Sequence, residues 1–285
     1  MKGGGQTLRI GWFSTGRDEA ARKLLRTVMD QKERGFFDVS VEFVFCNWEP
    51  GEEPEHGDHD ERERFFEMVR SYDIPLFALS WKRFRPELRR DERELWRLEY
   101  GRAVRELLEE RPFELGVLAG YMLWVDDETC LKYDLINLHP ALPGGPKGTW
   151  QEVIWQLVEE RADRQGAMIH LTTPEWDEGP ALTFCSFPIV GEEWDPLWKG
   201  IDEKIRRKGL AAVMREDGES EPLFRRIREA GERRELPLIA HSIKLFADGK
   251  VFIRDQQLYV DGEPLDRAYD LTDEVNGEIM NRGNG

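Results

Sequence analysis

Two polar side chains stand two residues apart at the end of a short apolar segment. Residues 135–138 read Leu-Ile-Asn-Leu, and His139 and Pro140 follow them. This segment predicts a strand that Pro140 ends, and on a strand residues two apart point the same way. We therefore expect Asn137 and His139 to face one site, while the residues between them pack.

A third polar side chain, Asp177, lies in the connection 172–180 between two predicted strands. Converging Asn, His and Asp side chains suit acyl transfer to an amine. The carboxamide donates a hydrogen bond to the developing oxyanion, and the imidazole moves protons near neutral pH, with a carboxylate to favour its charged form. Spacing alone leaves a second interpretation open, in which Asn137 caps the loop and His139 is a hydrogen-bonded packing histidine.

The surrounding chain alternates strand-like and helix-like segments. Strands are predicted at 8–13, 39–46, 74–79, 115–119, 135–138, 167–171 and 181–188, and helices at 18–29, 61–72, 91–110, 127–133 and 150–161. This alternation implies an α/β fold with a parallel sheet. Ligands bind beyond the carboxyl ends of the strands in such sheets, which is where Asn137 and His139 stand and where Asp177 can reach.

The last third of the chain is charge-rich and helical. Residues 191–234 predict an elaboration on the sheet edge with a break near 217–219, 236–246 predict a closing helix, and 251–253 with 257–260 predict a hairpin. We interpret 1–190 as the sheet core, 191–234 as a helical elaboration, and 235–285 as the closing helix and hairpin of the same domain.

Composition limits the possible partners. The 285 residues are 40% hydrophobic and 34% charged, and no apolar run approaches the roughly 20 residues of a membrane span. A net charge of -16 repels polyanions, so we expect no nucleic-acid partner, and the missing apolar run predicts no membrane association. The N-terminus carries no signal-peptide core, so we predict a cytoplasmic protein. It would be a monomer or a homodimer.

No metal site is expected. Cys46, Cys130 and Cys185 lie far apart, which indicates neither a disulfide framework nor a zinc site, and each is interpreted as a core residue. The segment 56–60 contains two histidines and two aspartates, but we interpret it as a solvated loop and helix cap.

Three runs taken together resemble the folate-dependent formyltransferases, most of all those that act on glycinamide ribonucleotide. The runs are Leu118-Ala119-Gly120-Tyr121-Met122, then Asn137-Leu138-His139-Pro140-Ala141-Leu142-Pro143, then His170 with 172–180. The resemblance covers about 8–262, and 191–234 is longer than the family usually has. It implies the formyltransferase fold, a Rossmann-like, mostly parallel sheet flanked by helices.

The resemblance also implies the donor, 10-formyltetrahydrofolate, and the roles of three residues. Asn137 would stabilise the oxyanion, His139 would act as general acid or proton shuttle, and Asp177 would support the protonated imidazole. The pterin would lie between two loops and contact Tyr121, Met122, Leu123, Trp124, Val125, Thr173, Glu175 and Trp176. An arginine common in the family after the methionine is Leu123 here.

The acceptor side departs from the family pattern. Ser14, Thr15, Gly16 and Arg17 replace its phosphate-binding turn and can still cradle an anion, whereas Asp18 and Glu19 oppose phosphate if they point inward. Two further residues are assigned to the acceptor by resemblance, Pro140 and Glu235. Glu235 would contact the amine end, or it is an exposed acid at a helix start.

We predict formyl transfer from 10-formyltetrahydrofolate to a primary amine, in first place glycinamide ribonucleotide in purine biosynthesis. Three alternatives stay open: another amine such as an amino sugar, hydrolysis of the formyl folate, and a folate- or nucleotide-binding module without turnover. A nicotinamide-linked dehydrogenase is disfavoured because the first turn lacks Gly-x-Gly-x-x-Gly. His170 is interpreted as an interior histidine bordering the site.

Overall fold

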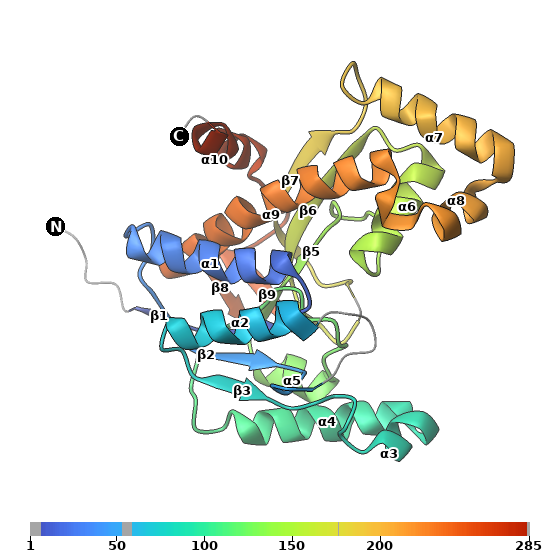
Figure 1. The fold of residues 1–285 in the computed structure, drawn as a ribbon. Coiled ribbons are helices and arrows are strands. Elements are labelled where there is room, and N and C mark those ends of the chain that lie inside the picture. Colours follow the sequence, from blue (N-terminus) through green and yellow to red (C-terminus); the bar gives the residue numbers. More distant parts are fainter. Residues whose placement is uncertain (1–6, 53–58, 176, 284–285) are drawn as a thin grey trace. The chain divides into compact units, whose positions relative to one another are not determined.

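The computed structural model describes residues 7–52, 59–175 and 177–283, and Figure 1 shows its helices and strands. The chain divides into two compact units. Unit 1 comprises Met1–Leu138, His170–Pro180 and Ile239–Asp266, and unit 2 comprises His139–Ile169, Ala181–Leu238 and Arg267–Gly285. The predicted division into 1–190, 191–234 and 235–285 stays a prediction.

Unit 1 is built on parallel strands. Their hydrogen-bonded order is β5-β4-β1-β2-β3, and each neighbouring pair is parallel. The strands are β1 (Leu8–Ser14), β2 (Val39–Cys46), β3 (Leu76–Ala78), β4 (Leu115–Leu118) and β5 (Leu135–His139), of which His139 belongs to unit 2. The prediction of a mostly parallel α/β sheet is confirmed.

Helices cover both faces of these strands. In Figure 1, α1 and α2 lie on one side and α4 on the other. Trp96, Tyr100 and Val104 recur every fourth residue along α4 and pack against Phe13 and Phe43 of the strands. The helices of this unit include α1 (Glu19–Glu33), α2 (His59–Ser71), α3 (Pro86–Asp91), α4 (Arg93–Leu107) and α5 (Asp127–Lys132).

The helix predicted at about 91–110 is α4, and the short helix α3 before it was not predicted. The two helices meet at Glu92, whose backbone leaves the helical region at φ -141° and ψ 68°. Pro86 begins α3, where its fixed φ and missing N–H are tolerated. The helix α3 buries no side chain and therefore has no apolar stripe in its sequence. The helix α4 packs into the core, so its apolar residues recur at helical spacing and predict a helix.

Unit 2 contains β6 (Arg164–Leu171), whose last two residues belong to unit 1, and β7 (Ala181–Pro188). The order is β11-β7-β6, and the unpredicted β11 (Tyr269–Asp270) is parallel to β7. The helices α6 (Trp150–Glu160), α7 (Asp195–Lys208) and α8 (Leu210–Glu216) share a core with β7 that includes Ile154, Trp155, Phe187, Ile201 and Val213. The 3-10 helix Gly218–Ser220 follows α8, and α10 (Thr272–Gly283), also unpredicted, follows β11.

The closing helix predicted at 236–246 is the second half of a longer helix. One helix, α9 (Pro222–Ala247), runs through this region with Pro237 inside it. An internal proline costs about 3 kcal/mol because it removes a backbone hydrogen bond. Leu238, Ile239 and Ala240 directly after it are fully buried, so burial of apolar side chains offsets that cost.

The predicted terminal hairpin is present in unit 1. It is formed by β8 (Val251–Arg254) and β9 (Gln257–Val260), and β10 (Glu263–Pro264) extends it to an antiparallel sheet. In the described ranges, no helix combines the length and the apolar character that crossing a membrane requires.

Candidate active site

The carboxyl ends of β4 and β5 position Asn137. Leu118, the last residue of β4, pairs with Asn137 in the parallel register, so both lie where these strands end. Ile136 is fully buried, whereas Asn137 is half-buried. The alternation along the strand therefore keeps Ile136 in the core and leaves the Asn137 carboxamide partly open.

Asn137 lines a cavity of unit 1 that we call the Asn137 cavity. At about 50 Å³ it is far smaller than the roughly 300–1,000 Å³ typical of a small-molecule pocket, so a whole folate requires its walls to move apart. Its polar wall contains Asn137, His170 and Asp177. Residues that the sequence assigned to the donor also line it: Tyr121, Leu123, Trp124, Val125, Thr173 and Glu175.

His170 holds the carboxamide of Asn137. Its Nδ1 lies 2.9 Å from the carbonyl oxygen of Leu171, which can only accept, so Nδ1 carries the proton. In the neutral imidazole Nε2 is then an acceptor, and the Nδ2 of Asn137 donates to it at 3.0 Å. The sequence identified His170 only as a residue bordering the site, although its place directly before the 172–180 connection was a signal.

Asp177 approaches the same imidazole. Its Oδ1 lies 3.7 Å from the Nε2 of His170, which is longer than a hydrogen bond. Its backbone is left-handed at φ 52°, a conformation that costs a non-glycine residue energy and is enriched at functional sites. Gly179 is needed nearby, because a Cβ there would lie 1.7 Å from the carbonyl oxygen of Leu171.

The two loops that form the wall are joined by a hydrogen bond. The indole Nε1 of Trp124 donates to the carbonyl oxygen of Pro174 at 3.1 Å. Met122, also assigned to the donor, is exposed, and its backbone N–H donates to Thr15 Oγ1 at 2.9 Å. Trp176 lies outside the described residues.

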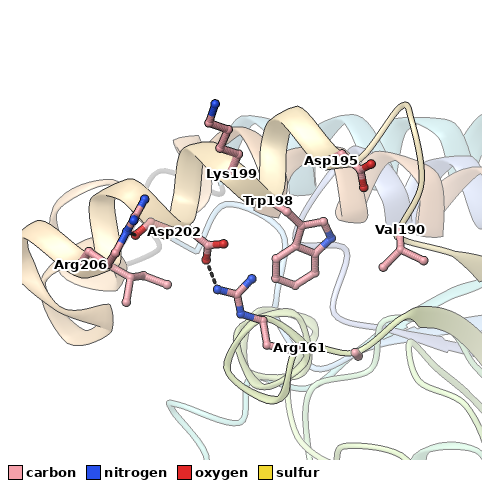
Figure 2. Close-up of a pocket in the computed structure, with 9 residues that line it drawn as sticks. Arg161, Val190, Asp195, Trp198, Lys199, Asp202 and Arg206 are labelled. Carbon is pink, nitrogen blue, oxygen red and sulfur yellow. Dashed lines mark hydrogen bonds and ion pairs between the residues drawn. The ribbon is translucent and has the colours of Figure 1, made fainter.

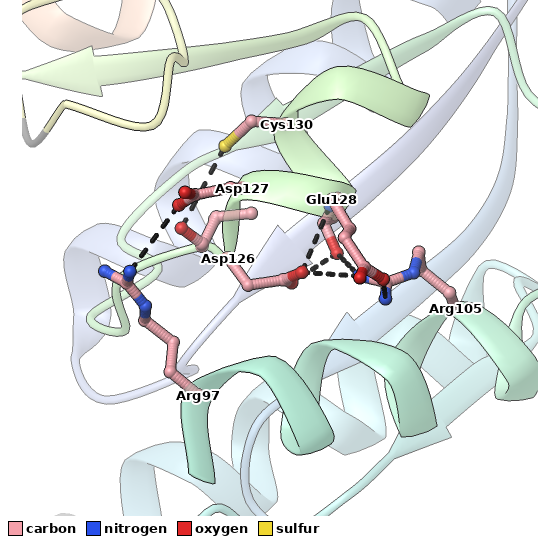
Figure 3. Close-up of polar contacts among 8 residues, drawn as sticks. Arg97, Arg105, Asp126, Asp127, Glu128 and Cys130 are labelled. Atoms are coloured by element: carbon pink, nitrogen blue, oxygen red, sulfur yellow. Dashed lines mark hydrogen bonds and ion pairs between the residues drawn. The ribbon is translucent and has the colours of Figure 1, made fainter. Parts of the chain in front are cut away.

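A buried ion-pair network anchors the residues that follow the loop 121–125 (Figure 3). Arg105 of α4 donates to Asp126 Oδ1 and to Thr129 Oγ1, each at 2.6 Å, and also pairs with Glu128. Asp126 caps α5 by accepting from the backbone N–H of Thr129. Gly101 leaves room for this carboxylate, since a Cβ there would lie 1.7 Å from Asp126 Oδ2. The network therefore holds Asp126, directly after the loop 121–125, against α4.

His139 is described by its contacts in unit 2. It is 2% exposed, and its Nε2 lies 2.9 Å from the carbonyl oxygen of Pro146. Because that oxygen only accepts, Nε2 carries a proton. The general-acid role of His139 stays a prediction, because every neutral imidazole carries one ring proton.

In the turn 14–17, which was assigned to the acceptor's phosphate, two backbone N–H groups already make hydrogen bonds within the protein. The N–H of Thr15 donates to Gly120 O at 3.0 Å, and that of Gly16, at φ 60°, donates to Ser14 Oγ at 3.2 Å. Asp18 is the N-cap of α1 and accepts from the N–H of Ala21 at 3.0 Å. A carboxylate thus already stands at this helix start, where it repels a second anion.

The other residues assigned to the acceptor belong to unit 2. Pro140 is half-buried, and its carbonyl oxygen accepts from Gln165 Nε2 at 2.8 Å. Glu235 is 5% exposed inside α9, so the alternative of an exposed acid at a helix start is wrong. Its Oε1 accepts from Arg228 Nη1 at 3.0 Å. Its role toward an amine stays a prediction.

The cysteines lack the properties of nucleophiles. Burial raises the pKa of the Cys46, Cys130 and Cys185 thiols to about 12, and none of them lines the Asn137 cavity. The thiolate is therefore scarce near neutral pH. Among the described residues no group of three or more His, Cys, Asp or Glu side chains is arranged to hold a metal ion, while His56 and Asp58 lie outside them.

A wider cavity of about 640 Å³ lies in unit 2 (Figure 2). Arg161 pairs there with Asp202, and its guanidinium lies 5.1 Å from the ring centre of Trp198. The lining contains no residue that the sequence assigned to the donor or the acceptor. The volume of a cavity alone therefore does not identify the predicted active site.

Comparison with known proteins identifies a matching protein family. Residues 60–197 match the profile of the formyl transferase family. The matched range contains Asn137, His139 and Asp177, whereas the turn at 14–17 and Glu235 lie outside it.

Relatives agree with this result. The chain is 27% identical over 177 residues to the phosphoribosylglycinamide formyltransferase of Dictyostelium discoideum, covering 58% of this chain and 78% of that protein. The predicted resemblance to the folate-dependent formyltransferases, and with it the prediction of a formyltransferase-type enzyme, is confirmed.

Solved structures support the fold. The phosphoribosylglycinamide formyltransferase of Coxiella burnetii has a TM-score of 0.65 at 16% identity, covering 93% of this chain and all of that one. A formyltetrahydrofolate deformylase of Pseudomonas syringae has a TM-score of 0.57 at 19% identity, covering 90% of this chain and 66% of that one. A transferase and a deformylase thus share this fold.

Proposed function

We propose that the protein transfers the formyl group of 10-formyltetrahydrofolate to a primary amine, with glycinamide ribonucleotide as the first acceptor to test. One observation carries the proposal: Asn137 and Asp177 line a single cavity together with six residues assigned to the donor. The relative in Dictyostelium is named for the same acceptor. Both substrates are small molecules, and we propose the cytoplasm as the compartment.

The chemistry needs a hydrogen-bond donor and a proton carrier. The amine nitrogen attacks the formyl carbon and gives a tetrahedral oxyanion, which the Asn137 carboxamide would stabilise. The bond to N10 then breaks, the amine loses a proton, and N10 gains one, so the products are a formamide and tetrahydrofolate. His139 would carry this proton, and Asp177 would stabilise the charged state of an imidazole.

The acceptor need not be phosphorylated. Asp18 caps α1 at the turn where the family resemblance expects a phosphate. This favours, as a second candidate, an amine without phosphate such as an amino sugar.

The test is release of tetrahydrofolate from 10-formyltetrahydrofolate with glycinamide ribonucleotide, with an amino sugar, and with water alone. We expect release that depends on an amine and falls about 100- to 10,000-fold in His139→Ala. Full-rate release with water alone would identify a hydrolase. Unchanged turnover in His139→Ala would contradict the proposed mechanism.

A further inference from the structure

The loop 121–125 is tied at its start to the end of β1. The backbone N–H of Thr15 donates to the carbonyl oxygen of Gly120 at 3.0 Å, and the N–H of Met122 donates to Thr15 Oγ1 at 2.9 Å. One bond uses the backbone of Thr15 and the other its side chain, and together they join two segments 107 residues apart. We call this pair of hydrogen bonds the Thr15 clamp.

The clamp acts where the loop begins to line the Asn137 cavity. Tyr121 and Leu123, on either side of Met122, both line this cavity. Met122 does not line it, and its side chain is 37% exposed. The bond from the Met122 N–H to Thr15 therefore holds the one loop residue that turns away from the cavity, with its two neighbours turned toward it.

The loop is also held at its other end. Arg105 donates to Asp126 directly after the loop, and the indole of Trp124 donates to the carbonyl oxygen of Pro174. At the start of the loop, Gly120 adopts φ 66°, which a glycine reaches without strain. A loop that is already held in its binding conformation costs less entropy to order when a ligand binds.

Thr15 itself is poorly suited to hold an anion. It is 4% exposed, its N–H is used by Gly120, and its carbonyl oxygen accepts from Arg62 Nε at 3.4 Å. Helix α2 packs over the turn, since a Cβ on Gly16 would lie 2.8 Å from Phe65 Cδ1. A phosphate at such a turn binds free backbone N–H groups, and that of Thr15 is not free.

We propose that Thr15 is a positioning residue for the formyl donor and not a contact of the acceptor. Its hydroxyl oxygen holds Met122, and through it the loop 121–125, in the conformation that receives the donor. This inference rests on the proposed function. It moves Thr15 from the acceptor, to which the sequence assigned it, to the donor.

The experiment compares two substitutions of Thr15. Thr15→Val keeps the branched shape and the backbone N–H but removes the acceptor oxygen, whereas Thr15→Ser keeps a hydroxyl. Thr27→Val is the matched control, because Thr27 is 5% exposed in α1 and does not line the Asn137 cavity. Tetrahydrofolate release gives kcat and the KM values for 10-formyltetrahydrofolate and for the active amine, and urea unfolding reports the stability of each variant.

We expect Thr15→Val to raise the donor KM about three- to tenfold, the range of one hydrogen bond, with kcat and the acceptor KM within about twofold of wild type. Thr15→Ser should keep the donor KM of the wild type, and so should Thr27→Val. An unchanged donor KM in Thr15→Val would overturn the assignment. A rise in the acceptor KM alone, or an equal rise of the donor KM in Thr15→Ser or in Thr27→Val, would do so as well.

Failure of the proposed function gives a different result. If neither an amine nor water releases tetrahydrofolate from the donor, that function falls. Titration with tetrahydrofolate, which is the donor without its formyl group, then tests the clamp by tryptophan fluorescence. Weaker binding by Thr15→Val than by the wild type and Thr15→Ser supports the clamp. Equal binding by all three proteins, or no binding by the wild type, overturns it.

Discussion

The two hydrogen bonds of His170 can be separated by substitution. The carboxamide of glutamine can place an acceptor oxygen near the position of Nε2, and that of asparagine can place an N–H donor near the position of Nδ1. His170→Gln therefore keeps the contact to Asn137, which is 3.0 Å long in the wild type. His170→Asn keeps the contact to the carbonyl oxygen of Leu171, which is 2.9 Å long.

The expected effects differ because one contact orients the carboxamide that would stabilise the oxyanion. Removing an oxyanion donor outright costs about 100- to 1,000-fold in kcat, so a donor that is present but no longer oriented should cost about 10- to 100-fold. We expect this loss in His170→Asn and a loss of about threefold or less in His170→Gln. Each variant gives up one hydrogen bond, so both should lose about 1 kcal/mol of unfolding free energy.

The assay is tetrahydrofolate release at saturating donor and acceptor, with urea unfolding of both variants as the control for stability. KM for the donor should change less than kcat, since the contact acts on the reacting carbonyl. Equal kcat losses in the two variants would refute the positioning role of His170. Full activity in His170→Asn would do so as well.

Three further predictions address the scaffold, the acceptor and the thiols. Gly101→Ala should lower the unfolding free energy by about 2–3 kcal/mol in urea titration, because its Cβ would displace Asp126; an unchanged midpoint would contradict the close approach. Asp18→Asn keeps the helix cap and removes one negative charge. If the phosphate of glycinamide ribonucleotide binds at this turn, its KM should fall about two- to fivefold, and an unchanged KM would place the phosphate elsewhere. Iodoacetamide at pH 8 should leave the folded enzyme active, because burial raises the pKa of all three thiols to about 12; rapid labelling with loss of activity would show a reactive thiolate.

The strands and the position of Asn137 were predictable because their signals are local. The segments 39–46 and 181–188 form strands with the predicted bounds, since apolar residues fill them and turn residues flank them. The helices α3 and α9 were not predicted correctly, because their ends depend on what they pack against. Glu92 separates α3 from α4 although the sequence pattern continues, and α9 passes through Pro237 because the residues after it are buried.

Residue types and their order along the chain limited the kind of chemistry. A carboxamide and an imidazole at a strand end, with a carboxylate in a later connection, suit acyl transfer, and the family resemblance favoured this over a structural interpretation. Only the tertiary structure decided which groups meet: the pairing of Asn137 with His170, and the cavity that Asn137, His170 and Asp177 line together with the loop after β4. The physical reason is that strand and helix periods act over a few residues. Contacts between residues 33 apart, such as Asn137 and His170, arise only when the elements pack.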